Sequence, residues 1–183
     1  MTNAVTTAGA ASRPIGLKLA AALAGALVVA GAAQVAIPIP GTPVPFTLQP
    51  LAVLIVGGLL GARYGATSLA LYLALGALGL PVFTPFGAPG LARLLGPTGG
   101  FLLAYPVAAA IVGRLAGGSY ARCALAALAG MAVIYAGGVA QLAILGPGAV
   151  ALAVTPFLAA DLVKTLLAAL VLRRFGPLSR ALR

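Results

Sequence analysis

The chain of 183 residues has one acidic residue, Asp161, and Lys164 follows it three positions later. Both lie in the apolar segment 150–172, which is long enough to cross a bilayer. Residues three apart on a helix share a face, so the carboxylate and the ammonium are within reach of an ion pair. A charged side chain at mid-membrane costs about 2.5–3.5 kcal/mol, so the pair serves either helix packing or a polar ligand inside the protein.

Arg93 is a second candidate for ligand binding. It lies near the end of residues 81–100, a stretch rich in Pro and Gly that favours irregular backbone. An irregular connection of this length is typical of a binding loop or lid. If Asp161 lies in the outer half of its helix, the guanidinium can join the Asp161/Lys164 pair around a small anionic solute. The alternative is a loop arginine that snorkels to the membrane surface.

Other polar side chains inside the apolar segments are few. They are Gln34, Thr47, Gln49, Tyr72, Tyr105, Tyr135, Gln141 and Thr155. Each can simply bond a neighbouring helix, a contribution of about 0.6 kcal/mol on average. We favour that interpretation for Gln141, Tyr72 and Tyr105, whereas the residues alone leave Gln49 and Tyr135 open.

The composition indicates an all-α integral membrane protein, because 62% of the residues are apolar and only 7% are charged. The net charge of +10 does not indicate nucleic-acid binding, since the basic residues are scattered between apolar segments and form no dense basic face. One cysteine and no histidine exclude a Cys/His metal cluster. Residues 96–100 (Gly-Pro-Thr-Gly-Gly) lack the Lys-Ser/Thr end of a nucleotide-binding loop, so no ATP site is expected.

The elements that must position these side chains are predicted to form a six-transmembrane-helix bundle. The membrane domain covers 13–175, with approximate spans at 15–37, 46–62, 66–80, 101–115, 124–145 and 150–172. Residues 1–12 are predicted to be a disordered cytoplasmic tail and 176–183 a basic cytoplasmic tail. The run Ala30-Gly31-Ala32 resembles a signal-peptide cleavage site, but the charges on the later loops are best explained if the first segment is retained.

The basic residues predict the orientation of the bundle, because cytoplasmic loops carry an excess of Lys and Arg. With Arg13 and Lys18 placed in the cytoplasm, seven further basic residues fall on the same side. These are Arg63, Arg114, Arg122, Arg173, Arg174, Arg180 and Arg183. Arg93 alone falls outside, so both termini are predicted to be cytoplasmic.

Four sequence blocks combine polar or glycine residues with apolar ones in a recognisable pattern. They are Pro45-Phe46-Thr47-Leu48-Gln49-Pro50-Leu51-Ala52-Val53-Leu54, Gly76-Ala77-Leu78-Gly79-Leu80-Pro81-Val82-Phe83, Gly96-Pro97-Thr98-Gly99-Gly100-Phe101 and Asp161-Leu162-Val163-Lys164. These blocks resemble the BioY family of biotin transporters, occur in family order and span nearly the whole chain. The resemblance implies the substrate-binding S component of an energy-coupling-factor (ECF) transporter, with six helices and cytoplasmic termini, in the cytoplasmic membrane.

The resemblance also implies the site residues and the partners. The family's Asp and Lys that engage biotin match Asp161 and Lys164, and its loop arginine matches Arg93. It further assigns Gln49, Tyr135 and Gly99 to the pocket. Pro50 stands where relatives often carry Thr, a departure that affects nothing central.

No cofactor is expected, and biotin is the transported ligand. The implied partners are a coupling (T) subunit and ATPase subunits, together with the lipid bilayer. Small residues recur at four-residue spacing on two faces of the first helix. Ala20 and Ala24 lie on one face, and Ala22, Ala26 and Ala30 lie on an adjacent face. Such ridges let helices approach closely. In S components of this type a small-residue motif docks the coupling subunit, which makes Ala20 and Ala24 the candidate docking face; the alternative is packing within the bundle itself.

Other functions stay open on the residues alone. The chain can be an S component for another small vitamin-like solute, a membrane enzyme that uses Asp161 as a general acid or base, or a purely structural subunit. An aspartyl protease needs two carboxylates, and this chain has one. We therefore expect a binding protein and not an enzyme.

Overall fold

The computed structural model describes residues 15–146, 150–151 and 154–176. Helix α1 spans Ile15–Gln34 and leads into strand β1 (Ala36–Ile37), which pairs antiparallel with β2 (Phe46–Thr47). The connection between the strands, 38–45, contains four prolines, which prevent helix formation. The first helix accordingly ends three residues before the expected position 37. The expected tails at 1–12 and 176–183 lie outside the described residues, apart from Gly176.

Helix α2 (Gln49–Ala77) reverses direction at Gly61, which has a φ of 78°. In a straight helix, Gly57 and Gly65 would be about 12 Å apart. A Cβ on Gly65 would instead lie 2.8 Å from the Cα of Gly57, so the two halves of α2 fold back on each other. The sequence predicted two segments here, 46–62 and 66–80, joined by a turn at 63–65. The turn is at Gly61, because glycine tolerates the left-handed conformation that the reversal requires.

The remaining helices begin earlier or later than expected. Helix α3 (Leu91–Leu95) interrupts the 81–100 stretch, which was expected to be irregular throughout, and α4 runs from Gly99 to Leu115. Helix α5 (Tyr120–Leu145) begins four residues before position 124, because the Ser119 hydroxyl caps it by accepting a hydrogen bond from the Arg122 N–H at 3.2 Å. The last segment forms a short 3₁₀ turn, η1 (Thr155–Phe157), and then α7 (Leu158–Phe175).

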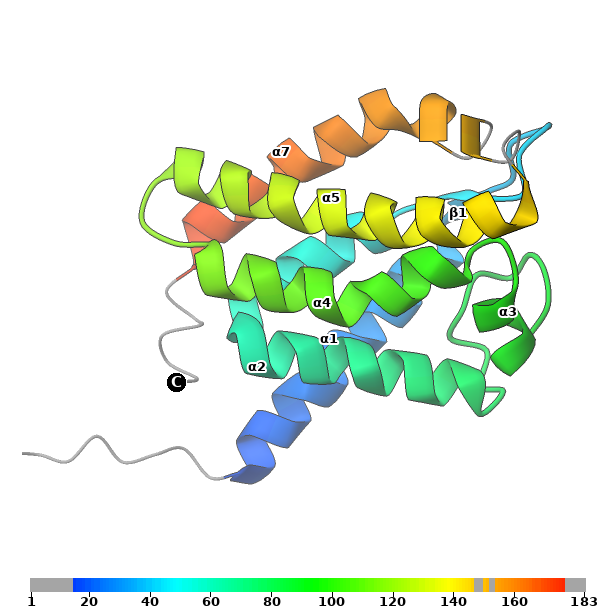
Figure 1. Cartoon of the computed structure of the whole chain (residues 1–183). Coiled ribbons are helices and arrows are strands. Elements are labelled where there is room, and N and C mark those ends of the chain that lie inside the picture. The colour runs from blue at the N-terminus through cyan, green and yellow to red at the C-terminus, as the bar shows by residue number, and fades with distance from the viewer. Residues whose placement is uncertain (1–14, 147–149, 152–153, 177–183) are drawn as a thin grey trace, which may run out of the picture.

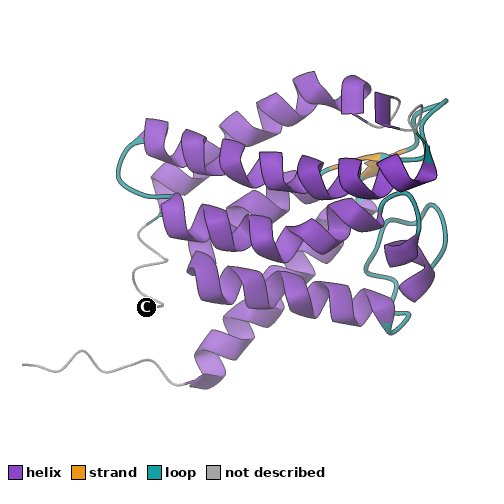
Figure 2. Ribbon diagram, in the orientation of Figure 1, coloured by secondary structure: helices purple, strands orange, loops and turns teal. Residues whose placement is uncertain are grey.

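The helices pack into one bundle around α2 (Figure 1). Helix α2 contacts α1, α4 and α7, while α5 lies between α4 and α7. The loops at 35–48 and 78–98 and the start of α7 gather at one end, where the two short strands also lie (Figure 2). The α4–α5 connection and the end of α7 lie at the opposite end. The two ends of the bundle are therefore chemically different, one rich in proline and the other in arginine.

Large apolar side chains cover the outside of the bundle, as expected of a surface in contact with lipid. Leu19, Leu23, Leu27, Leu103, Val107, Leu162, Val163 and Leu170 are among the exposed ones. Within the described residues, α1, α2, α5 and the Thr155–Phe175 segment are long and apolar enough to cross a membrane, and α4 is a shorter apolar helix. The chain is a multi-pass membrane protein.

Candidate functional site

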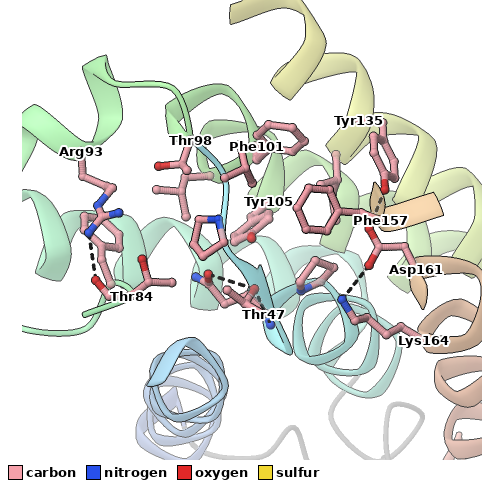
Figure 3. A pocket seen from close by; sticks show the side chains of 17 residues that line it. Thr47, Thr84, Arg93, Thr98, Phe101, Tyr105, Tyr135, Phe157, Asp161 and Lys164 are labelled. Carbon is pink, nitrogen blue, oxygen red and sulfur yellow. Dashed lines mark hydrogen bonds and ion pairs between the residues drawn. The ribbon is translucent and has the colours of Figure 1, made fainter. Parts of the chain in front are cut away.

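A cavity of about 640 Å³, including its open mouth, lies at the proline-rich end of the bundle. Its walls come from the 38–48 and 81–98 loops and from α2, α3, α4, α5, η1 and α7. Residues far apart in sequence therefore share one site (Figure 3).

Asp161 and Lys164 form the charged side of this cavity. They lie three residues apart in the first two turns of α7, and the Lys164 ammonium donates to Asp161 Oδ1 at 2.7 Å. The Tyr135 hydroxyl of α5 donates to Asp161 Oδ2 at 2.6 Å. Asp161 and Lys164 are 7% and 5% exposed, so the predicted ion pair is both formed and buried. A carboxylate has about four acceptor positions, and two remain for donors of a ligand.

Arg93 lies on the short helix α3. This helix begins directly after Gly90, where a φ of 65° turns the chain. Its Nε–H donates to the Ala88 carbonyl and its Nη2–H to the Thr84 carbonyl, both at 2.9 Å. Burial lowers the pKa of the Arg93 guanidinium, and arginine side chains keep their proton in proteins. The side chain is therefore fixed by its own loop and does not snorkel, and further N–H donors remain for an anion.

Gln49 lies at the start of α2 beside β2 and lines the cavity with Thr47. Its Nε2 donates to the Tyr72 hydroxyl at 2.6 Å, and the Thr47 hydroxyl donates to Gln49 Oε1 at 3.4 Å. Tyr72 is thus bonded within the bundle, as predicted, but its partner is a cavity residue. The amide of Gln49 is held in one orientation against the cavity wall.

Gly99 does not line the cavity, although its neighbour Thr98 does. A Cβ on Gly99 would collide with the Leu94 carbonyl oxygen and come within 2.7 Å of Gln141 Nε2. Gln141 itself donates to the carbonyls of Leu94, at 3.1 Å, and Gly96, at 2.6 Å. The glycine therefore allows a close approach that holds the end of α3. Gln141 bonds a neighbouring helix, as predicted, through the Leu94 carbonyl of α3, and it also bonds the following loop through the Gly96 carbonyl.

Sequence reasoning missed most of the apolar lining. Phe101, Tyr105, Ile134 and Phe157 line the middle of the cavity. Tyr105 was expected to bond a neighbouring helix, and Ile134 and Phe157 have no neighbouring charge or motif spacing that points to a site, whereas Phe101 ends one of the blocks that carry the family resemblance. Thr98 was within reach of prediction, because it lies in the Gly-Pro-Thr-Gly-Gly stretch that carries the family resemblance.

The charged and the apolar side chains occupy separate parts of the cavity. Arg93 and Thr84 lie at one side, Asp161, Lys164 and Tyr135 at the other, and the rings of Phe101 and Tyr105 between them (Figure 3). Two cations and one carboxylate line the cavity, so its net charge is positive by one unit. Such a cavity fits an elongated monoanion with a hydrogen-bonding head and an apolar body.

A bundle of membrane helices with a ligand cavity at one end defines the chain as a membrane-embedded solute-binding protein. The comparisons with known proteins identify the family. The chain belongs to the BioY family, whose family model matches residues 4–181.

Two curated relatives cover most of the chain. The "Biotin transporter BioY" of Thermotoga maritima is 40% identical over 158 residues, 84% of this chain and 91% of that protein. The "Probable biotin transporter BioY" of Pyrococcus horikoshii is 42% identical over 134 residues, 72% of this chain and 80% of that protein. A crystal structure of "the S-component for biotin from an ECF-type ABC transporter" superposes with a TM-score of 0.78 at 27% identity, covering 89% of this chain and 92% of that one.

Proposed function

We propose that this protein binds biotin in the cavity and takes it up across the cytoplasmic membrane as the substrate-specific component of an ECF transporter. The observation that carries the proposal is the order of the cavity: a carboxylate and an ammonium at one side, apolar rings in the middle and a guanidinium at the other side. Biotin has a matching order, with a ureido group, an apolar bicycle and a valerate tail that ends in a carboxylate.

In this proposal the ureido N–H groups donate to Asp161, and Lys164 donates to the ureido carbonyl. The carboxylate then pairs with Arg93 at the far side of the cavity, and Gln49 and Tyr135 complete the polar wall. The two hydrogen bonds that Arg93 makes to its own loop support this arrangement, because they orient the guanidinium before the ligand arrives. Gly99 contributes through the backbone approach that it permits, beside the cavity.

Retention of radiolabelled biotin by the purified protein in detergent tests this function. We expect saturable binding with competition by unlabelled biotin, and weaker competition by biotin methyl ester, because the ester removes the charge that Arg93 would meet. A different vitamin-like solute that displaces biotin at lower concentration would indicate another S-component specificity. Absence of biotin binding by folded protein would contradict the proposal. The relatives are named as transporters, which supports a binding protein over an enzyme.

We further propose six membrane spans with both termini in the cytoplasm. The halves of α2 before and after Gly61 count as two spans, and α1, α4, α5 and α7 supply the others. The start of α1, the α4–α5 connection and the end of α7 lie at the end of the bundle opposite the cavity (Figure 1). These helix ends carry Lys18, Arg114, Arg122 and Arg173, which supports the orientation derived from charge.

Cysteine labelling tests this orientation. In a background with the buried Cys123 replaced by Ala, we expect Thr42→Cys, in the 38–45 loop, to react with an impermeant maleimide on intact cells. Ala121→Cys, exposed at the start of α5, should react only after permeabilisation. Reaction of Ala121→Cys on intact cells would contradict the proposed topology.

Transport also requires energy, and we propose that T and ATPase subunits supply it. The exposed face of α1 is the proposed docking surface for the T subunit, because Ala20 and Ala24 are exposed, whereas Ala22 and Ala26 pack into the bundle. Gly16 and Gly31 extend the exposed stripe, and a Cβ on either would meet no atom within 4 Å. A flat stripe of small residues permits close contact with a partner helix.

A pair of matched substitutions on α1 tests the docking surface. Ala24→Trp is expected to prevent co-purification with the T and ATPase subunits while biotin binding in detergent stays unchanged. Ala26→Trp, with the same residue change on the buried face, should instead lower the melting temperature and biotin binding together, because Ala26 is 1% exposed. If the Ala24→Trp protein still co-purifies with the T and ATPase subunits, the T subunit docks on a surface other than this face of α1.

A further inference from the structure

The ammonium of Lys164 lies against the face of an aromatic ring. Its Nζ is 3.8 Å from the centroid of the Phe46 ring. Phe46 lies on β2, where it pairs with Ile37 of β1. Successive side chains of a strand point to opposite faces, and the next residue, Thr47, lines the cavity while Phe46 does not. Phe46 therefore contacts Lys164 from behind the site.

This contact completes the surroundings of a buried cation. Lys164 is 5% exposed, and Asp161 accepts from its ammonium on the cavity side. A cation over a ring face is attracted by the ring quadrupole, most strongly where water is excluded. The Phe46 ring is in turn stacked on Phe157, with centroids 6.5 Å apart and planes inclined by 14°. Strand β2, η1 and α7 therefore meet at the Lys164 ammonium.

We propose that Phe46 is a positioning residue for Lys164: the face of its ring holds the ammonium beside Asp161 and toward the ligand. The ring does this through its charge distribution and not only through its bulk. The inference rests on the proposed function for the identity of the ligand, biotin. It assigns to Phe46, which does not line the cavity, a role in affinity that does not require contact with the ligand.

Fluorinated phenylalanines at position 46 test the inference, because fluorine weakens the negative ring face with little change in ring shape. We expect the biotin Kd to rise stepwise through mono-, di- and trifluorophenylalanine, up to about 30-fold in total, the size of a strong desolvated cation–π contact. The same series at Phe175, which ends α7 and does not line the cavity, is the control and should leave Kd nearly constant.

Melting temperatures of the same proteins separate this inference from the proposed function. Fluorination at Phe46 should lower the melting temperature stepwise in the Lys164 protein, but not in a Lys164→Met background. If unmodified protein fails to bind biotin while this dependence holds, the proposed function is wrong and the ring still positions the cation. A Kd series that stays flat in biotin-binding protein, or melting temperatures that respond equally in both backgrounds, would overturn the inference.

Discussion

Asp161→Asn is expected to weaken biotin binding by at least 30-fold. In the wild-type protein both carboxylate oxygens are engaged, Oδ1 by the Lys164 ammonium and Oδ2 by the Tyr135 hydroxyl. An amide removes the negative charge and turns one of these acceptors into a donor, which then faces another donor. Truncating one member of a buried charged hydrogen bond costs about 2–5 kcal/mol, which corresponds to roughly 30-fold to several-thousand-fold in affinity.

Titration of labelled biotin into the purified variant, with the folded fraction measured in parallel, checks this expectation. Leu162→Asn is the matched control, because it places the same amide one residue further along α7, on a side chain that is 51% exposed. That variant should keep its biotin affinity. If Asp161→Asn lowers only the melting temperature and its folded fraction binds biotin as the wild type does, the pair is structural and the proposed site is wrong.

The sequence was most informative where chemistry is local. The Asp161/Lys164 ion pair follows from a spacing of three residues on one helix, and the structure confirms it at 2.7 Å. The all-α membrane class follows from composition alone, because apolar segments of that length have few other uses. Both inferences depend on residues near one another in the chain.

Features that depend on packing between distant segments could not be predicted in the same way. Several glycines near position 60 could have made the turn in α2, and the choice of Gly61 is tied to the close approach of Gly57 and Gly65. Gln141 bonds carbonyls 45 and 47 residues away, so its partners depend on how α5 lies against the α3–α4 loop. The apolar middle of the cavity likewise exists only once α4, α5 and η1 are assembled.

The double variant Asp161→Asn/Lys164→Met is expected to bind biotin at least 30-fold more weakly than the wild type, yet to melt close to it. Each single variant leaves a buried charge without its partner, which costs about 3–5 kcal/mol of stability. Removing both charges avoids that penalty, because exchange of a buried ion pair for neutral groups of similar volume is often neutral or stabilising. Methionine preserves the length of the lysine stem, so the packing against Phe46 is retained.

The double variant distinguishes a pair that binds the ligand from a pair that only stabilises the bundle, because the two roles predict different biotin affinities. If Asp161 and Lys164 only hold α7 in place, the neutral pair restores stability, and biotin affinity returns with it. If they contact the ligand, as we propose, stability recovers while affinity stays low, since neither the acceptor for the ureido N–H groups nor the donor to its carbonyl has been replaced. Melting curves and biotin titrations of the wild type, both single variants and the double variant form a complete cycle. A double variant with wild-type affinity would show that the pair does not bind biotin.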